Sequence, residues 1–166
     1  MSKTARIVGI SLAAAFAGGL TVSASAQLVT HKDLTTGMAM TMAETAIQTC
    51  KQQGYNVSAN VVGRTGQVLV AMRGDNTGPH TLENSMKKAY TANAQRRPSG
   101  EFAEAVKKNP TAGALYLSNI VPAQGALPIK VGNETIGAVG VSGAPGGDKD
   151  EACAKAGIDK VASELK

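Results

Sequence analysis

The stretch that decides the fold is Pro128–Gly143, PIKVGNETIGAVGVSG. It predicts two short strands joined at Asn133-Glu134, a polar pair typical of tight hairpins. The second strand, Thr135–Ser142, has no charge and is apolar on both faces, so we expect both faces of the sheet to be covered there. Its recurring glycines, at 137, 140 and 143, favour close approach by a helix, another backbone or a flat ligand.

The segments before this hairpin predict a helix and a second hairpin. Thr35 or Thr36 is suited to cap the helix, which carries an apolar stripe at helical spacing and ends at Gly54. Asn56–Val62 then alternates between apolar and polar residues, which predicts a half-exposed strand. Gln67–Arg73 alternates as well, and the two runs form an antiparallel hairpin.

Three further helices and one weak strand complete the prediction. A helix is expected at Thr81–Gln95, with Leu82, Met86, Ala89 and Asn93 on one face, followed by a short helix at Gly100–Lys108 that Ser99 caps. The apolar run Leu115–Val121 favours an extra strand. A last helix is expected at Glu151–Leu165, capped by Asp148 or Asp150. Strands linked by hairpins predict a mostly antiparallel sheet, whose faces the helices must cover.

The N-terminus has the pattern of an export signal. Lys3 and Arg6 precede an apolar run, Ile7–Leu20, and the sequence Ala24-Ser25-Ala26 matches a cleavage site. We therefore expect residues 1–26 to be cleaved and residues 27–166 to form one periplasmic or secreted domain, with an uncleaved anchor as the alternative. Loss of the two signal cations reduces the formal charge from +5 to +3, a mild basic bias without a basic run, which argues against nucleic-acid binding.

The chain has two cysteines, Cys50 and Cys153, in the first and last predicted helices. Two readings remain open: two small buried thiols, or a disulfide that an oxidising compartment would preserve. Zinc is not expected, because the sequence has no CxxC motif and no Cys/His cluster.

Few residues have the pattern of an enzyme site. The sequence has no G-x-S-x-G, HExxH or P-loop motif. His31 and His80 have two possible interpretations: ordinary surface histidines, or axial ligands to haem iron. The cations Arg73, Lys87, Lys88, Arg96 and Arg97 lie on or near one helix; they indicate a solvated face or a pair of charges for the carboxylates of a flat apolar ligand.

Two blocks of this sequence resemble the GlcG/HbpS family, which is also called the haem-degrading family. The first block contains Arg73–Pro79 (RGDNTGP), Glu83, Ser85 and Lys88–Ala92 (KAYTA). The second contains Pro128-Ile129, Ile136–Asp148 (IGAVGVSGAPGGD), Asp150-Glu151 and Ala154–Gly157 (AKAG). The resemblance spans about Leu34 to Leu165 and is more specific for the family than for an activity.

The resemblance implies an α/β (α+β) fold: a profilin-like, three-layer α/β/α domain with a mostly antiparallel sheet of about five strands. It also implies homo-oligomers, often octameric, and, for secreted members, haem binding with a role in iron sensing beside a membrane sensor protein. A threonine in a Pro-Thr pair is associated with haem in that subgroup, and Thr111 is the matching position here. The predicted haem residues are therefore Thr111, His80, Arg73, Lys88 and His31, with Thr111 or His80 next to the iron.

These observations favour a secreted haem-binding protein that acts as carrier, scavenger or sensor accessory. Three alternatives stay open: a module that binds another small molecule, such as a carboxylate metabolite or a corrinoid; a haem-degrading enzyme, although no residue is an evident acid, base or nucleophile; and a structural oligomer without ligand.

Overall fold

The computed structural model describes residues 28–166, and residues from His31 onward form one compact unit. Its main helices are α1 (Thr36–Gln52), α2 (Thr81–Gln95), α3 (Ser99–Lys108) and α4 (Gly147–Lys160). Two short 3₁₀ helices are η1 (Gly113–Tyr116) and η2 (Ala162–Glu164). The strands are β1 (Ser58–Gly63), β2 (Val68–Met72), β3 (Ala126–Val131) and β4 (Glu134–Ser142).

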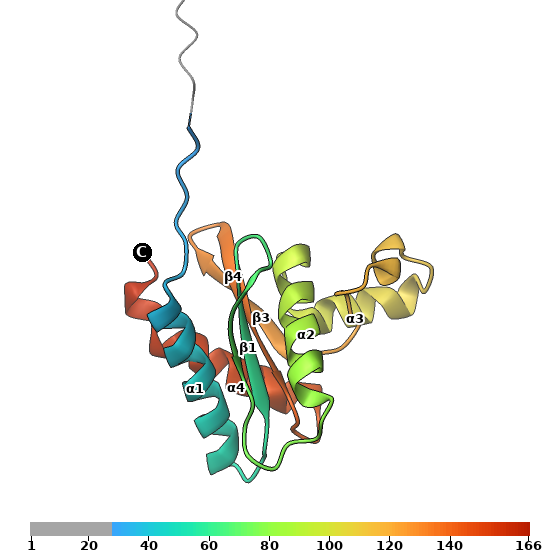
Figure 1. Cartoon of the computed structure of the whole chain (residues 1–166). Coiled ribbons are helices and arrows are strands. Elements are labelled where there is room, and N and C mark those ends of the chain that lie inside the picture. The colour runs from blue at the N-terminus through green and yellow to red at the C-terminus, as the bar shows by residue number, and fades with distance from the viewer. Residues whose placement is uncertain (1–27) are drawn as a thin grey trace, which may run out of the picture. The chain divides into compact units, whose positions relative to one another are not determined.

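The four strands form one antiparallel sheet in the order β2-β1-β4-β3, so β1 and β4 are central. Helices α1 and α4 pack together on one face, and α2 covers the other face, as Figure 1 shows. This is the predicted three-layer α/β/α arrangement with an antiparallel sheet. The sheet has four strands in the described part of the chain rather than about five, because Leu115–Val121 is not a strand.

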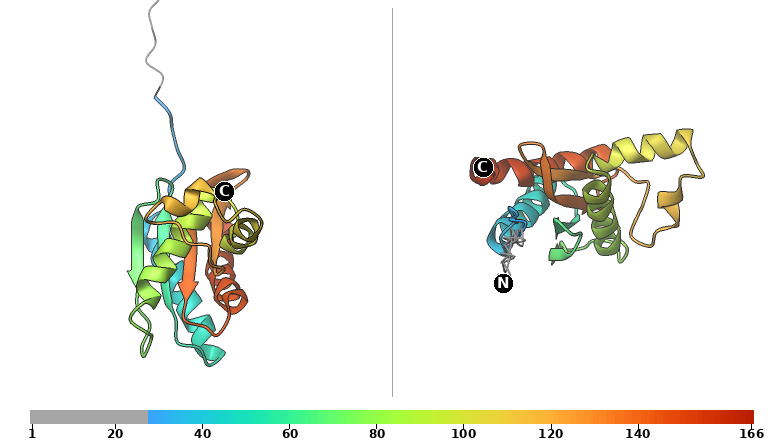
Figure 2. Two further views of the ribbon diagram at one scale, coloured as in Figure 1. Left: turned by 90° about the vertical axis from the view of Figure 1, so that its right-hand side faces the viewer. Right: turned by 90° about the horizontal axis from the view of Figure 1, so that it is seen from above.

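That apolar run instead contributes to a projecting arm, which consists of α3, η1 and the chain up to Pro122. Figure 2 shows the arm (yellow to orange) extending away from the sheet. Leu115 and Tyr116 belong to η1, and Tyr116 and Leu117 are 81% and 60% exposed. The prediction of a strand was wrong here, because no strand among residues 28–166 pairs with this segment.

The central strands are more buried than the alternating pattern indicated. All residues of β1 are buried, although a half-exposed strand was predicted. Val57, Ala59 and Val61 enter the core beneath α1 and α4, while Ser58 and Asn60 are covered by α2. Polar residues are tolerated there because Ser58 shares a hydrogen bond of 2.8 Å with Thr81, and Asn60 donates to Leu82 O and to Ser85 Oγ.

Most helix boundaries follow local chemistry. Thr35 caps α1, because its side chain accepts a hydrogen bond from Met38 N, and Gly54, with φ +84°, follows the helix end as predicted. Two caps were predicted wrongly. Ser99 is the first residue of α3 and accepts from Ala126 N, and α4 begins at Gly147, so Asp150 lies inside the helix and faces Lys88.

The β3–β4 hairpin turns at Gly132-Asn133, one residue earlier than predicted, because Gly132 supplies the left-handed conformation with φ +58°. The glycines of β4 do allow close packing, as predicted. A Cβ atom on Gly140 would overlap Ser85 O and Ala89 N, both in the backbone of α2. The absence of a side chain at Gly140 therefore lets α2 lie directly on the sheet.

Replacing Gly140 with alanine is expected to lower the free energy of unfolding by about 1–3 kcal/mol, because α2 must move away from β4. Urea denaturation of the variant measures the change. Gly113→Ala is the control, since a Cβ there meets no atom within 4 Å. Equal stability of Gly140→Ala and wild type would contradict the close contact.

The two cysteines form a disulfide between α1 and α4, with a sequence separation of 103. The Cα atoms of Cys50 and Cys153 are 5.7 Å apart, and both side chains are fully buried. Of the two interpretations that the sequence allowed, the structure therefore shows the disulfide and not the two free thiols. The bridge ties the first helix to the last on the same face of the sheet.

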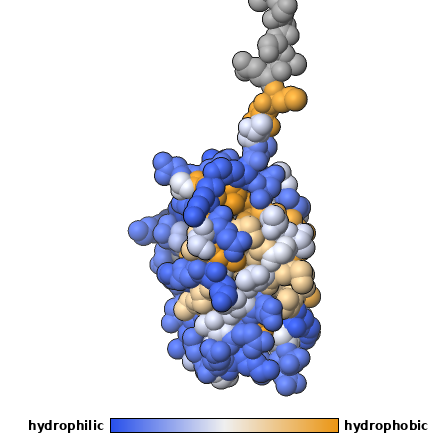
Figure 3. Space-filling view, turned by 90° about the vertical axis from the view of Figure 1, so that its left-hand side faces the viewer, coloured by the Kyte–Doolittle hydropathy of each residue, from blue (hydrophilic) through white to orange (hydrophobic). Residues whose placement is uncertain are grey.

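The α1 side of the molecule is a mixed surface. Figure 3 shows hydrophobic residues surrounded by hydrophilic ones on this side, and Met40 of α1 is 52% exposed. No helix among residues 28–166 has the length and apolar character needed to cross a bilayer. The predicted signal, residues 1–26, lies outside the described residues.

Candidate functional site

A polar cleft lies at the end of the sheet where β1 begins and β4 ends, a point fixed by the pairing of Ser58 with Ser142. Its volume is about 690 Å³. The lining comes from five separate parts of the chain: Gly54–Asn56, the loop Asn76–His80, the first turns of α2, Ala123-Gln124, and Ser142–Asp150. Both motif blocks therefore meet at this cleft, which we call the polar cleft.

A buried ion pair forms the floor of the polar cleft. Lys88 Nζ lies 2.8 Å from Asp150 Oδ2, and the two side chains are 5% and 4% exposed. Lys88 also donates to Val141 O at 3.1 Å, and Asp150 Oδ1 accepts from Ala144 N. The pair thus joins α2 and α4 to the end of β4.

Burial raises the pKa of the Asp150 carboxyl above its ordinary value, although the charge of Lys88 and its hydrogen bond act in the opposite direction.

Gly125 leaves the space in which the Lys88–Asp150 pair is enclosed. A Cβ at this position, where φ is +131°, would lie 2.7 Å from Lys88 Nζ and 2.8 Å from Asp150 Cβ. Only glycine leaves room for the two charged side chains to meet.

Hydroxyl and amide groups line the wall of the polar cleft on the α2 side. Asn84 Nδ2 donates to Ser142 Oγ at 2.9 Å, and Ser58 Oγ lies between Thr77 and Thr81. The buried face of α2 carries Thr81, Ser85 and Lys88 in addition to alanines. The predicted apolar face, with Leu82 and Met86, is only half-buried, because α2 packs on the polar side of β1.

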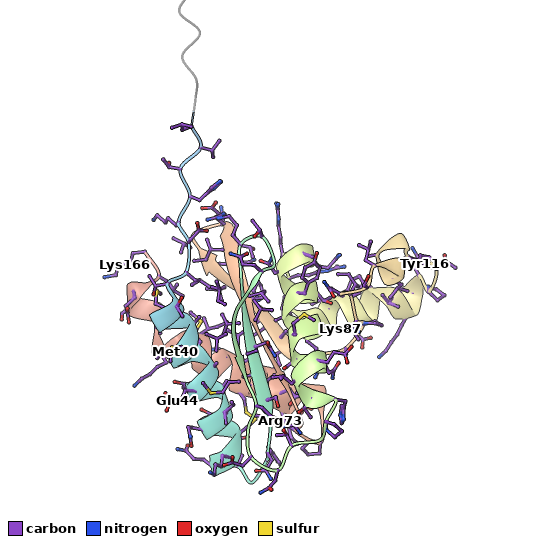
Figure 4. The ribbon with its side chains drawn as sticks, in the orientation of Figure 1. Met40, Glu44, Arg73, Lys87, Tyr116 and Lys166 are labelled. Atoms are coloured by element: carbon purple, nitrogen blue, oxygen red, sulfur yellow. A yellow bond between two sulfur atoms is a disulfide. The ribbon has the colours of Figure 1, made fainter. Side chains whose placement is uncertain are left out.

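The structure separates the predicted haem residues. His80 and Lys88 line the polar cleft, with His80 exposed at its rim. Arg73 lies in a neighbouring depression and donates to Thr77 O at 2.7 Å, and His31 is exposed before α1. Thr111 is exposed on the arm, where its Oγ1 donates to Asn109 Oδ1. Figure 4 shows Tyr116 at the tip of the arm, far from Arg73.

The other cations that the sequence placed near α2 also have different surroundings. Lys87 pairs with Glu83 at 2.7 Å, and this hydrogen bond lowers the pKa of Glu83. Arg97 lies over the ring of Phe102 at 5.7 Å. These cations therefore do not converge on one ligand.

A second concavity, of about 700 Å³, runs along α3, and we call it the α3 groove. Its lining combines small apolar residues, acids and bases: Pro98, Gly100, Glu101, Ala103, Glu104, Ala105, Lys107, Lys108, Pro122, Gln124 and Glu151. Thr111 follows α3 by three residues. Within residues 28–166, His, Cys, Asp and Glu side chains form no group of three that could hold a metal ion.

Glu151 lies between the α3 groove and α4. Burial raises the pKa of its carboxyl, a hydrogen bond with Gln124 acts against this, and the charges of Glu101 and Asp148 raise it further. Its Oε2 atom is buried and has no hydrogen-bond partner within the described residues. The ionised form of Glu151 is therefore disfavoured in the folded chain.

Replacing Glu151 with glutamine is expected to stabilise the protein at pH 7 and to have little effect near pH 4. The folded-state pKa lies above the unfolded value near 4.5, so wild type gains stability as the pH falls through the folded-state pKa. Glutamine imitates the neutral form at every pH. The variant therefore has this additional stability already at pH 7, and its stability does not rise further as the pH falls. Urea denaturation of both proteins at the two pH values measures the difference, with the exposed Glu44→Gln as control. A larger stabilisation at pH 4 than at pH 7 would contradict the sign.

Residues 31–166 form one α/β/α unit, and the polar cleft and the α3 groove both have the size of small-molecule sites. A family model described as "Haem degrading protein HbpS-like" matches residues 34–159, and the chain therefore belongs to the HbpS-like family. This confirms the resemblance that the two motif blocks indicated.

Individual relatives agree with this assignment. The crystal structure of HbpS is 32% identical, with a TM-score of 0.78, over 82% of this chain and 96% of that one. An uncharacterised 15.0 kDa protein from the dhaT-dhaS intergenic region of Citrobacter freundii is 33% identical over 66% of this chain and 80% of its own length. The structure of a PduOC:heme complex, at 24% identity and a TM-score of 0.67, covers 76% of this chain and 93% of that one and shares the fold.

Sequence reasoning missed Asp150 as the partner of Lys88 and missed Ser142 and Asn84 as lining groups. One signal was present. Thr81, Ser85 and Lys88 recur at helical spacing, and a polar stripe beside small residues indicates a buried network when a polar strand face lies opposite.

Proposed function

We propose that this chain is an exported haem-binding protein that acts as a carrier, scavenger or sensor accessory. Membership of the HbpS-like family carries this proposal. A protein of the same fold, PduOC, has been solved as a heme complex, which supports it further. The signal-like sequence of residues 1–26 supports export to the periplasm or the outside of the cell.

The α3 groove is the proposed haem site. It offers the small apolar residues Ala103, Ala105 and Pro122, and Lys108 provides a cation for one propionate. Lys107 forms an ion pair with Glu104 at 2.6 Å, but both side chains are exposed, so a propionate can replace the carboxylate of Glu104. Thr111, at the end of α3, is the proposed neighbour of the iron. The polar cleft suits haem less well, because Lys88 is already neutralised by Asp150 and the lining is mainly polar.

Self-association is part of the proposal. Strand β2, VLVAM, lies at an edge of the sheet, carries no charge, and exposes Val68 by 47%. Unpaired edges of this kind favour pairing with another strand. Tyr116 and Leu117 on the arm are a further exposed apolar surface that a neighbouring copy could bury. Light scattering of residues 27–166 reports the assembly.

A hemin titration followed at the Soret band tests haem binding, and Thr111→Ala tests the site. Wild type is expected to give a saturable shift, and Thr111→Ala is expected to bind about tenfold more weakly because a group next to the iron is lost. Ser118→Ala, on the same arm, and His80→Ala, at the polar cleft, are expected to titrate like wild type.

The outcome that contradicts this site is a loss of affinity in His80→Ala together with normal binding by Thr111→Ala. Loss of the Soret band in the presence of a reductant, together with a ring-opened product, would instead favour the hypothesis that the protein is a haem-degrading enzyme.

A further inference from the structure

We infer that the polar cleft binds a small uncharged polyhydroxyl compound, such as a polyol or a sugar, independently of haem. The volume of about 690 Å³ lies within the range of small-molecule sites. Several lining side chains are built into the protein rather than free on its surface. Thr81, Lys88, Ser142 and Asp150 are all less than 5% exposed.

The charge of the polar cleft selects against ionic ligands. The lysine and aspartate side chains that line it are Lys88 and Asp150, and these neutralise each other at 2.8 Å. An anion would find no uncompensated cation at the floor, and a cation would find no uncompensated carboxylate. Asp148, in the first turn of α4 beside Gly146, repels anions, and the partial positive charge of the helix N-terminus offsets its attraction for cations.

The hydrogen-bonding groups favour a ligand that both donates and accepts. Lys88 Nζ uses two of its three N–H donors, on Val141 O and Asp150. Asn84 donates to Ser142 Oγ, and within residues 28–166 its Oδ1 atom accepts no hydrogen bond. The Ser142 hydroxyl, which accepts from Asn84, keeps its own hydrogen to donate. A hydroxyl group can satisfy each of these atoms, because it has one donor and two acceptor positions.

The walls of the polar cleft are held by close backbone contacts. A Cβ on Gly74 would overlap Val57 O, and one on Gly143, where φ is +136°, would overlap Asn56 O. These contacts fix the loop before α2 and the loop after β4 against the residues that precede β1. The glycines of the two motif blocks therefore shape a preformed site, which reduces the entropy lost on binding.

Nuclear magnetic resonance titrations with glycerol, myo-inositol, D-glucose and trehalose test the inference, with gluconate and glucosamine as charged counterparts. At least one neutral probe is expected to cause saturable shifts of backbone amides in the segments 54–56, 76–84 and 142–150, and the charged counterparts are expected to bind more weakly. Non-specific stabilisation by polyols would produce no saturation and no cluster of shifts.

Asn84→Leu is the test variant, and Asn93→Leu is its matched control. Both asparagines are half-buried on α2, and each donates one side-chain hydrogen bond, Asn84 to Ser142 and Asn93 to Arg64 O. Asn84→Leu is expected to weaken binding of the neutral probe about tenfold, and Asn93→Leu is expected to leave it unchanged.

Three results would overturn the inference: no saturable shifts with any neutral probe, tighter binding of gluconate or glucosamine, or equal affinities for Asn84→Leu and wild type. Unfolding of Asn84→Leu would appear as loss of spectral dispersion, and Ser142→Ala then takes its place with the same expected loss. A hemin titration of Asn84→Leu that matches wild type separates this site from the haem site.

Discussion

Removing the Cys50–Cys153 disulfide is expected to lower the free energy of unfolding by about 4–5 kcal/mol. The two residues are 103 positions apart, so the bridge restricts most of the unfolded chain. A loop of about 100 residues corresponds to about 4.7 kcal/mol in the loop-entropy model. Urea denaturation of oxidised protein and of Cys50→Ala/Cys153→Ala measures the loss.

Reduced wild type is the control, because it loses the bridge without losing the volume of the two sulfur atoms. It should account for most of the change in the double variant. A difference below about 1 kcal/mol between oxidised and reduced protein would contradict the role assigned to the bridge.

Replacing Lys88 with methionine is expected to lower the free energy of unfolding by about 3–5 kcal/mol, because it leaves the Asp150 carboxylate buried without its cation. The added Asp150→Asn change removes that charge and keeps an oxygen for Ala144 N. Lys88→Met/Asp150→Asn should therefore recover at least half of the lost stability. Urea denaturation of the wild type, the two single variants and the double variant completes the cycle.

Two results would contradict a buried ion pair that stabilises the fold. One is a cost below about 1 kcal/mol for Lys88→Met, which would indicate that Asp150 is solvated or neutral without Lys88. The other is a double variant that is no more stable than Lys88→Met alone.

Local chemistry predicted much of the fold. The bounds of α2, the cap of α1 at Thr35 and the two hairpins depend on short-range signals, and the structure agrees with them to within about two residues. The β3–β4 hairpin was placed one residue late because Gly132, rather than Glu134, meets the need for a positive φ. The glycines of β4 predicted close approach by a helix, another backbone or a flat ligand, and at Gly140 the structure shows the helix α2.

Long-range contacts limited the remaining predictions. Lys88 and Asp150 are 62 positions apart, and nothing near either residue indicates its partner. The alternation in Asn56–Val62 was correct as a strand signal, but the burial of Ser58 and Asn60 depends on hydroxyls and carbonyls that α2 brings from 22 to 25 positions away. Leu115–Val121 has the composition of a strand and lacks a neighbouring strand, which only the three-dimensional arrangement reveals.

Hydrogen exchange with and without hemin tests the central claim, that haem binds along α3 and not in the polar cleft. The account predicts slower amide exchange in peptides from residues 99–122 when hemin is bound, and unchanged exchange in residues 74–84 and 142–150. Protection confined to the polar cleft, or no protection at saturating hemin, would contradict it.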